Sequence, residues 1–235
     1  MEFFSRASAI FAFLSGAANR VGLHRFTGEL PYRGDLMTHR VQYLPHLHIA
    51  LQYLILVEAV FLRHDDEPLL KVPISEIRAD AAGEAPRFVP RPSELDRMRA
   101  RVGVGQPIVI LNPNASDLLP LRKWPTERFA LLAKRILAEY PDARIVLTGA
   151  PSERVAAEGL CRDLGSPRVV SMAGETSLPE LLTLYSLADV LVTNDSGPGH
   201  FSSLTPVHAI VLFGPETPRL FGPLSSSSTV IWKEL

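Results

Sequence analysis

The feature that most constrains the fold is a repeated alternation of short apolar runs and amphipathic segments that begins at Pro107. The apolar runs lie at residues 108–111, 144–147, 169–172, 189–193 and 207–213, with a sixth candidate at 229–232. Helices are predicted between them at 125–140, 152–164 and 177–187, the last opened by a capping box of Ser177 and Glu180. Strands that are apolar throughout and alternate with helices form parallel sheets covered on both faces. The sequence therefore predicts an α/β fold, with one domain over residues 107–235.

The preceding residues are organised less regularly. Helices are predicted over 3–15 and from Pro45 to about Leu62, with a short strand at 20–23. These elements are too few to close a domain, so residues 1–64 are interpreted as a partial domain. Residues 65–106 are rich in proline, which favours an extended interdomain connector over a packed element, although a short helix is predicted from Ser93 to Arg101.

Composition and charge exclude several classes of protein. Apolar residues make up 46% of the chain and charged residues 21%, which is ordinary globular usage and excludes a disordered or fibrous chain. The 24 basic and 25 acidic residues leave no basic surplus for a nucleic-acid partner. The longest apolar stretch, residues 49–62, is shorter than the ~20 residues of a membrane span. Residues 7–18 lack the positive start of a signal peptide, so a cytoplasmic protein is expected.

Side chains that often bind metals or act as nucleophiles give weak signals here. Cys161 is the single cysteine and falls in a helical pattern, which indicates a buried structural thiol. His46 and His48 are two positions apart and would point to different faces of a helix, and no cysteine or carboxylate cluster completes a set, so no metal is expected. The glycine spacings of P-loop and nicotinamide-binding proteins do not occur in the candidate loops, which disfavours both classes.

The carboxyl ends of the predicted strands are where a parallel sheet binds its ligands. Four loops follow them, at residues 112–123, 148–153, 173–177 and 194–200. In the last loop, two glycines allow close approach of the backbone to a ligand, and free N–H groups at a following helix favour phosphate. Asp195 and Ser196 can hydrogen-bond a sugar hydroxyl, or they can simply cap that helix in a plain strand-to-helix turn.

Two cations precede the helix predicted at 125–140. Arg122 and Lys123 together can neutralise a diphosphate, which an arginine can bind with two hydrogen bonds. The alternative is a solvated basic pair beside a core tryptophan, Trp124.

The order of these loops resembles glycosyltransferase family 9, the lipopolysaccharide heptosyltransferase family. The motifs that carry the resemblance over most of residues 105–222 are Pro-Asn-Ala-Ser at 113–116, Lys-Trp-Pro at 123–125, Leu-Thr-Gly-Ala at 147–150, Ala-Gly-Glu-Thr-Ser-Leu at 173–178, Asp-Ser-Gly-Pro-Gly-His at 195–200 and Leu-Phe-Gly-Pro at 212–215. Residues 1–62, with Arg-Val-Gly at 20–22 and Thr-His at 38–39, resemble the later part of that family's acceptor domain.

The resemblance implies a GT-B-like fold, in which a Rossmann-like donor domain at 107–235 faces the acceptor domain. It further implies metal-independent, inverting transfer of a heptose-like sugar from a nucleotide-diphosphate sugar to a lipopolysaccharide-type glycolipid, at or near the inner-membrane face of the cytoplasm, without a cofactor. Carried over by position, Arg122 or Lys123 would contact the diphosphate, the run from Asp195 to Gly197 the sugar and phosphate, and Thr176 the nucleotide. The full set of candidate substrate-binding residues is Asn114, Ser116, Arg122, Lys123, Gly149, Thr176, Asp195, Ser196, Gly197 and His200.

Departures from the family pattern keep other functions open. The family's acidic general base has no match in this sequence, which we expect to be truncated at both ends. Pro151 stands where some members carry a ribose-binding glutamate, and Glu153 is close but shifted. A nucleotide-sugar-binding module without catalysis is therefore the alternative, and a sugar-nucleotide epimerase of the same fold is a third possibility.

Overall fold

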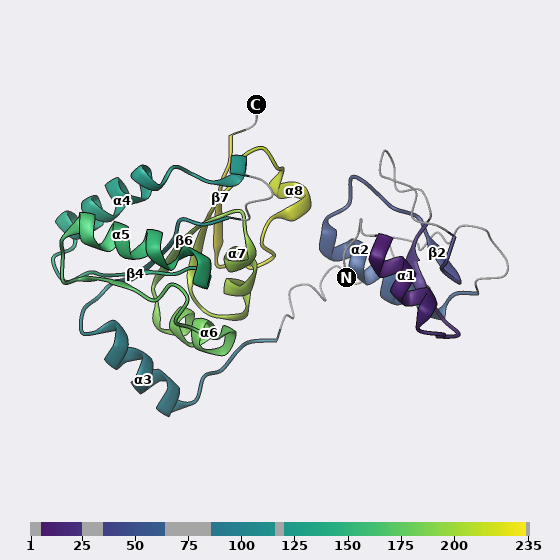
Figure 1. Ribbon diagram of the computed structural model, residues 1–235, viewed down its shortest axis with the longest axis horizontal. Coiled ribbons are helices and arrows are strands. Elements are labelled where there is room, and N and C mark those ends of the chain that lie inside the picture. Colours follow the sequence, from purple (N-terminus) through teal and green to yellow (C-terminus); the bar gives the residue numbers. More distant parts are fainter. Residues whose placement is uncertain (1–5, 25–34, 64–85, 116–119, 234–235) are drawn as a thin grey trace. The chain divides into compact units, whose positions relative to one another are not determined.

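The computed structural model describes residues 6–24, 35–63, 86–115 and 120–233 (Figure 1). The chain divides into two compact units, Met1–Ala82 and Gly83–Leu235. In the described residues, no helix is both long enough and apolar enough to span a membrane.

The second unit is built on a six-stranded parallel sheet with the order β5-β4-β3-β6-β7-β8. Its strands are β3 (Ile108–Asn112), β4 (Arg144–Leu147), β5 (Val169–Ser171), β6 (Val190–Asn194), β7 (His208–Leu212) and β8 (Ser228–Ile231). Since β3 is the first strand of this sheet along the chain, the order is that of a doubly wound Rossmann sheet, and it reverses between β3 and β6. The predicted α/β fold is confirmed.

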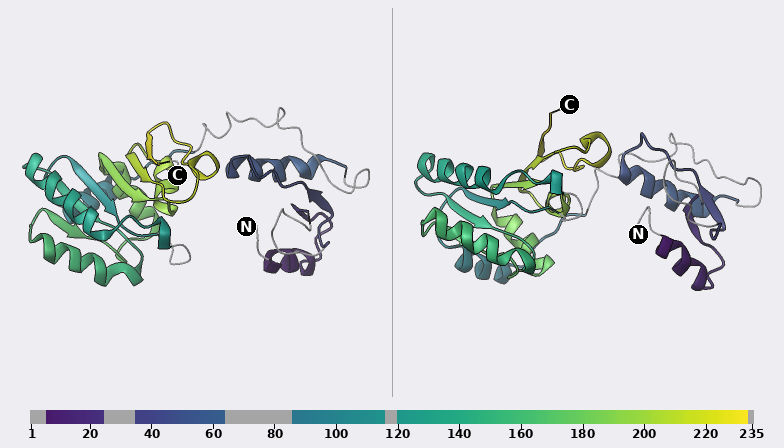
Figure 2. Two further views of the ribbon diagram at one scale, coloured as in Figure 1. Left: turned by 90° about the horizontal axis from the view of Figure 1, so that it is seen from above. Right: turned by 45° about the horizontal axis from the view of Figure 1, so that its top comes forward.

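Helices cover both faces of this sheet (Figures 1 and 2). Helices α3 (Pro92–Val102) and α6 (Leu178–Leu187) pack on one face, and α4 (Thr126–Glu139) and α5 (Arg154–Leu164) on the other. All five residues of β3 are buried, and alternate side chains enter the two apolar layers. A strand with both faces buried has no polar face, which explains its unbroken apolar run.

Helix α3 corrects the connector predicted over residues 65–106. Residues 64–85 lie outside the described residues, but the chain from Gly83 belongs to the second unit. Met98 is 3% exposed and packs with Val102 in the same apolar cluster as Ile110. The helix begins at Pro92, and the Glu94 carboxylate accepts a hydrogen bond from the Arg91 N–H. Proline at the first helical position therefore starts a packed helix here instead of extending a linker.

The first unit contains a short parallel pair of strands, β1 (Val21–Leu23) and β2 (His39–Val41), and two helices, α1 (Arg6–Leu14) and α2 (Ile49–Glu58). A 3-10 turn, η1 (Ala59–Phe61), continues α2. The start predicted for α2 at Pro45 is wrong, because His48 is the N-cap and its ring accepts a hydrogen bond from the Ala50 N–H.

Short elements place the loops at the carboxyl edge of the large sheet. They are the 3-10 turns η4 (Pro120–Arg122), η5 (Pro151–Glu153) and η6 (Ser202–Leu204), and the short helices α7 (Gly197–Phe201) and α8 (Pro218–Phe221). The longer elements of this unit begin and end within two residues of the predicted limits.

Candidate functional site

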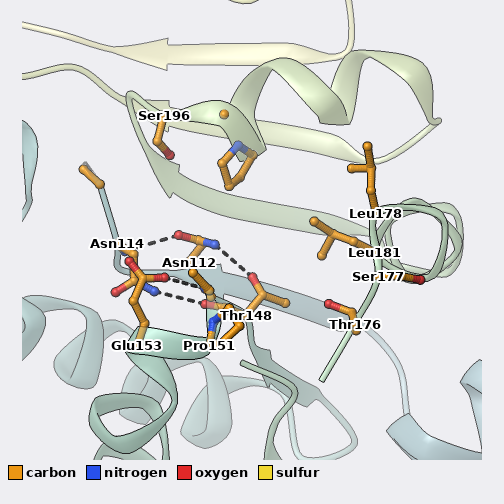
Figure 3. Close-up of a pocket in the computed structure, with 15 residues that line it drawn as sticks. Asn112, Asn114, Thr148, Pro151, Glu153, Thr176, Ser177, Leu178, Leu181 and Ser196 are labelled. Carbon is orange, nitrogen blue, oxygen red and sulfur yellow. Dashed lines mark hydrogen bonds between the residues drawn. The ribbon is translucent and has the colours of Figure 1, made fainter. Parts of the chain in front are cut away.

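A pocket of about 440 Å³ opens at the carboxyl edge of the six-stranded sheet (Figure 3). It is lined by Asn112, Asn114, Ala115, Thr148, Gly149, Ala150, Pro151, Glu153, Thr176, Ser177, Leu178, Leu181, Ser196, Gly197 and Pro198. These residues follow β3, β4, β5 and β6, so the pocket spans the point at which the strand order reverses. Rossmann sheets bind their ligands at this point, and the volume suits a small molecule.

One wall of the pocket is a polar link between the ends of β3 and β4. The Asn112 Nδ2 donates to Thr148 Oγ1 at 3.1 Å, and Asn112 Oδ1 accepts from the Asn114 N–H at 3.2 Å. The Asn114 Nδ2 donates to the Thr148 carbonyl at 3.2 Å. Figure 3 shows these bonds joining the three side chains across the strand ends. This wall is therefore held in place before any ligand arrives.

The absence of a side chain at Gly149 allows Asn114 and Glu153 to approach each other closely in this wall. A Cβ at this position would lie 2.7 Å from Asn114 Nδ2 and 2.8 Å from Glu153 Oε2. The Glu153 carboxylate accepts a hydrogen bond from the Ala150 N–H at 2.6 Å, at the start of the η5 turn. This turn brings Glu153 to the pocket, although its sequence position is shifted from the family pattern.

The opposite wall is apolar. Leu178 and Leu181 project from the first turns of α6, across the pocket from Asn112 and Thr148 (Figure 3). The predicted capping box opens this helix, with the Ser177 N–H donating to the Glu180 carboxylate at 2.8 Å. An apolar wall that faces amide and hydroxyl groups can hold a flat ring with a polar edge, such as a nucleobase.

A cluster of charges lies at the ends of the neighbouring strands β6 and β7. Arg122 Nε is 3.6 Å from Asp195 Oδ2, and Arg122 Nη2 is 3.3 Å from Glu216 Oε1. The Asp195 side chain is 4% exposed, and among the described residues neither its Oδ2 nor Arg122 Nε has a hydrogen-bond partner. Burial raises the pKa of Asp195, and the charge of Glu216 raises it further, while Arg122 and His200 act in the opposite direction.

Asn194 joins three segments beside this cluster. Its side-chain Nδ2 donates to the carbonyls of Pro113 and Asn114 at 3.0 and 3.3 Å. Its Oδ1 accepts a hydrogen bond from the Trp124 N–H at 2.9 Å. The fully buried Asn194 thereby fixes the loop after β3 and the residues that precede α4 to the end of β6.

The structure divides the predicted site residues into two groups. Asn114, Gly149, Thr176, Ser196 and Gly197 line the pocket. Arg122 and Asp195 form the charge cluster, to which His200 contributes its charge, and Lys123 is exposed next to Arg122. Ser116 lies outside the described residues.

The alternative interpretations of these two loops each agree with the structure in part. Ser196 is the N-cap of α7 but makes no capping hydrogen bond with its side chain, and its hydroxyl donates to the Asn194 carbonyl instead. Arg122 is half-buried beside carboxylates, whereas Lys123 is exposed, as a solvated cation would be. Trp124 is 37% exposed and so is not a core residue.

Several residues of the pocket and of the charge cluster were not predicted from the sequence. Thr148, Ser177 and Leu178 lie in motifs that carry the family resemblance, but they were not among the predicted substrate-binding residues. Asn112 and Leu181 lie outside these motifs. Glu216 lies beyond the four loops. Cys161, predicted to be buried, is only partly buried, and this burial raises the pKa of its thiol. In the described part of the chain, no group of three or more His, Cys, Asp or Glu side chains could hold a metal ion.

The second unit is thus a Rossmann-type domain with a pocket at its strand-order reversal. The sequence model of glycosyltransferase family 9 (heptosyltransferase) matches residues 5–235, and the chain belongs to this family.

Individual relatives agree with this assignment. Lipooligosaccharide heptosyltransferase 2 of Haemophilus influenzae is 27% identical over 234 residues, which cover 97% of this chain and 63% of the relative. The structure of Escherichia coli ADP-heptose lps heptosyltransferase II matches with a TM-score of 0.72 at 23% identity, over 97% of this chain and 65% of that protein. Escherichia coli heptosyltransferase WaaC with ADP matches with a TM-score of 0.53 at 18% identity, over 89% of this chain and 57% of that protein. The chain therefore spans less than two thirds of the length of these proteins.

Proposed function

We propose that this chain binds an ADP-linked heptose and serves the transfer of that sugar to a lipopolysaccharide-type glycolipid. The observation that carries the proposal is a pocket at the strand-order reversal with the Arg122 cluster beside it. Family membership supports the reaction class, since the relatives are named as heptosyltransferases. The names of two structures of the same fold include ADP-heptose and ADP, which supports adenine as the base.

In this proposal the nucleoside occupies the pocket. The base lies against Leu178 and Leu181, while Asn114, Thr148 and Glu153 offer polar groups to the ribose. Ser196 and Gly197 line the pocket where the loop continues from Asp195, so the diphosphate extends from there toward Arg122.

In the proposed reaction, the role of this chain is to stabilise the diphosphate as the leaving group. When the bond between the sugar and the diphosphate breaks, negative charge develops on the diphosphate, and fixed cations lower the energy of that state. Arg122 and Lys123 supply positive charge at this edge, and Asp195 can accept a hydrogen bond from a sugar hydroxyl. We infer a metal-independent, inverting transfer, in which the acceptor hydroxyl attacks the anomeric carbon from the face opposite the diphosphate. The bond from that carbon to the diphosphate breaks, and the hydroxyl proton passes to an acidic general base of the kind that the family uses.

The glycolipid acceptor is proposed from the names of the relatives. Lipooligosaccharide and lipopolysaccharide are glycolipids, so an acceptor hydroxyl would be presented at the cytoplasmic face of the inner membrane, with peripheral contact to it. The alternative is a nucleotide-sugar-binding module without catalysis, in which the same pocket and the Arg122 cluster hold the donor but no transfer follows. Membership of a glycosyltransferase family counts against the epimerase alternative.

The test is a thermal-shift panel with ADP, UDP and GDP and sugars linked to each. A ligand at 100 times its dissociation constant stabilises a protein by about 2.7 kcal/mol, which is an easily measured shift. Stabilisation by the adenine nucleotides alone is the expected result, and a cooperatively melting chain that responds to none of them contradicts the proposal. Release of ADP from ADP-heptose that depends on added glycolipid then distinguishes the transferase from the binding module.

A further inference from the structure

The backbone before Arg122 rests directly on the loop that follows β7. A Cβ at Gly214 would lie 2.8 Å from the Leu121 carbonyl oxygen and 3.4 Å from the Arg122 Cα. Both are backbone atoms, so a side chain at Gly214 would displace the η4 turn. The absence of a side chain at Gly214 therefore sets how closely the Arg122 backbone approaches the end of the sheet.

The same loop also holds the Arg122 side chain. Glu216 follows Gly214 by two residues, and its carboxylate is 3.3 Å from Arg122 Nη2. Asp195, at the end of β6, faces Nε of the same guanidinium at 3.6 Å. Arg122 is 25% exposed and Glu216 34% exposed, so solvent screens this ion pair only in part.

The residues that follow Arg122 are also fixed to the sheet. The Trp124 N–H donates to Asn194 Oδ1 at 2.9 Å. Arg122 thus lies between one hydrogen bond to the end of β6 and one backbone contact to the end of β7. In the part of the chain that the structure describes, its Nε has no hydrogen-bond partner, so the two carboxylates orient the guanidinium without satisfying that donor.

We propose that Gly214 and Glu216 are positioning residues that hold Arg122 where the diphosphate of the donor binds. The inference rests on the proposed function. A long side chain that is ordered in advance loses less conformational freedom when it binds an anion, and its donors are already aimed. Glu216 thus acts through Arg122 and does not touch the donor itself.

Glu216 has two opposite effects on an anionic ligand, and a double-mutant cycle separates them. Its carboxylate orders Arg122, which favours the diphosphate, but its negative charge also repels the diphosphate. The first effect requires the Arg122 guanidinium, whereas the second does not. Coupling between the two residues therefore reports the positioning role.

The experiment measures dissociation constants for ADP and adenosine by calorimetry on the 235-residue chain. The four proteins are the wild type, Glu216→Gln, Arg122→Ala and the double variant. We expect Glu216→Gln to weaken ADP binding about threefold to tenfold, within the range of couplings between contacting residues, and to leave adenosine binding unchanged. In the Arg122→Ala background the same substitution should not weaken ADP binding, because only the repulsion is then removed. An equal loss in both backgrounds, or none in the wild type, overturns the inference.

Gly214→Ala tests the same idea without changing any charge. It should weaken ADP binding and spare adenosine, and Glu216→Asp should retain part of the ADP affinity that Glu216→Gln loses. Matched controls lie on α5: Gly159→Ala, where the nearest atom is 3.8 Å from the new Cβ, and Glu158→Gln, which removes an exposed ion pair with Arg154. ADP affinity of the wild-type level in Gly214→Ala contradicts the inference. A wild-type chain that does not bind ADP overturns the proposed function as well, so the two failures are distinguishable.

Discussion

Asn194 and Asp195 are adjacent and both buried, yet their side chains meet different environments. Both ends of the Asn194 amide have hydrogen-bond partners on loops that converge at the sheet edge. Asp195 has an oxygen that finds no hydrogen-bond partner within the described ranges, and it faces a guanidinium nitrogen that also lacks one there. A satisfied buried amide stabilises the fold, whereas an under-satisfied buried carboxylate costs stability. The burial of Asp195 therefore costs stability that the burial of Asn194 does not.

The cost of burying Asp195 predicts a pH dependence of stability. Burial raises the pKa of Asp195 in the folded chain above its value in the unfolded chain, which is about 3.9. Between the two pKa values the folded state binds more protons than the unfolded state, so stability falls as the pH rises through this window. The contribution of Asp195 is fully present below the lower value and is lost above the higher one.

The measurement compares thermal melting of the wild type and Asp195→Asn at pH steps from 4 to 7. The wild type should lose stability relative to the variant as the pH increases, because asparagine does not titrate. A constant difference between the two proteins would show that the charges around Asp195, those of Arg122, His200 and Glu216, fully compensate its burial.

Helix α3 belongs to the core of the second unit although its sequence surroundings are typical of a linker. Met98 and Val102 fill the layer between α3, α6 and the sheet. The Arg144 guanidinium donates from Nε to the Val102 carbonyl at 2.9 Å, which satisfies an acceptor at the end of the helix. Loss of the packing of α3 should therefore destabilise the whole unit.

Met98→Ala should lower the free energy of unfolding of this unit by about 2–5 kcal/mol, the usual cost of such a cavity. Arg99→Ala, at an exposed position of the same helix, should change it by less than about 0.5 kcal/mol. Urea denaturation of the two variants makes the comparison. Equal and small effects would mean that α3 is a loosely attached connector after all.

At the level of the whole chain, the pocket and the charge cluster are made by one unit alone. Every residue that lines the pocket, and also Arg122, Asp195 and Glu216, lies within Gly83–Leu235. This unit has its own sheet and two apolar layers. It has what an independently folding domain requires.

A fragment of residues 83–235 should therefore fold cooperatively and bind ADP with the affinity of the whole chain. Calorimetry on both proteins is the direct comparison, with circular dichroism as the check on folding. A folded fragment that fails to bind, while the whole chain binds, would place part of the nucleotide site in the first unit.

Local patterns in the sequence were sufficient for most of the second unit. Unbroken apolar runs identified the strands of a doubly covered sheet, and the Ser177–Glu180 box marked the start of α6, because both signals depend on residues close together in the chain. The same reasoning missed β2, whose residues His39 and Arg40 break any apolar run, and α8, whose four residues are too few to show a helical period.

The sequence also led to the edge of the sheet where the site lies, because ligands bind at the carboxyl ends of parallel strands. Tertiary contacts decided which of the predicted residues line the pocket and which form the charge cluster. Asp195 and Ser196 are neighbours in one motif, yet one belongs to a buried charge cluster and the other lines the pocket. The contact of Arg122 with Glu216 depends on which strands are adjacent in the sheet, as does the hydrogen bond from the Trp124 N–H to Asn194 Oδ1. Strand adjacency is fixed by long-range packing, and periodicity and capping signals do not encode it.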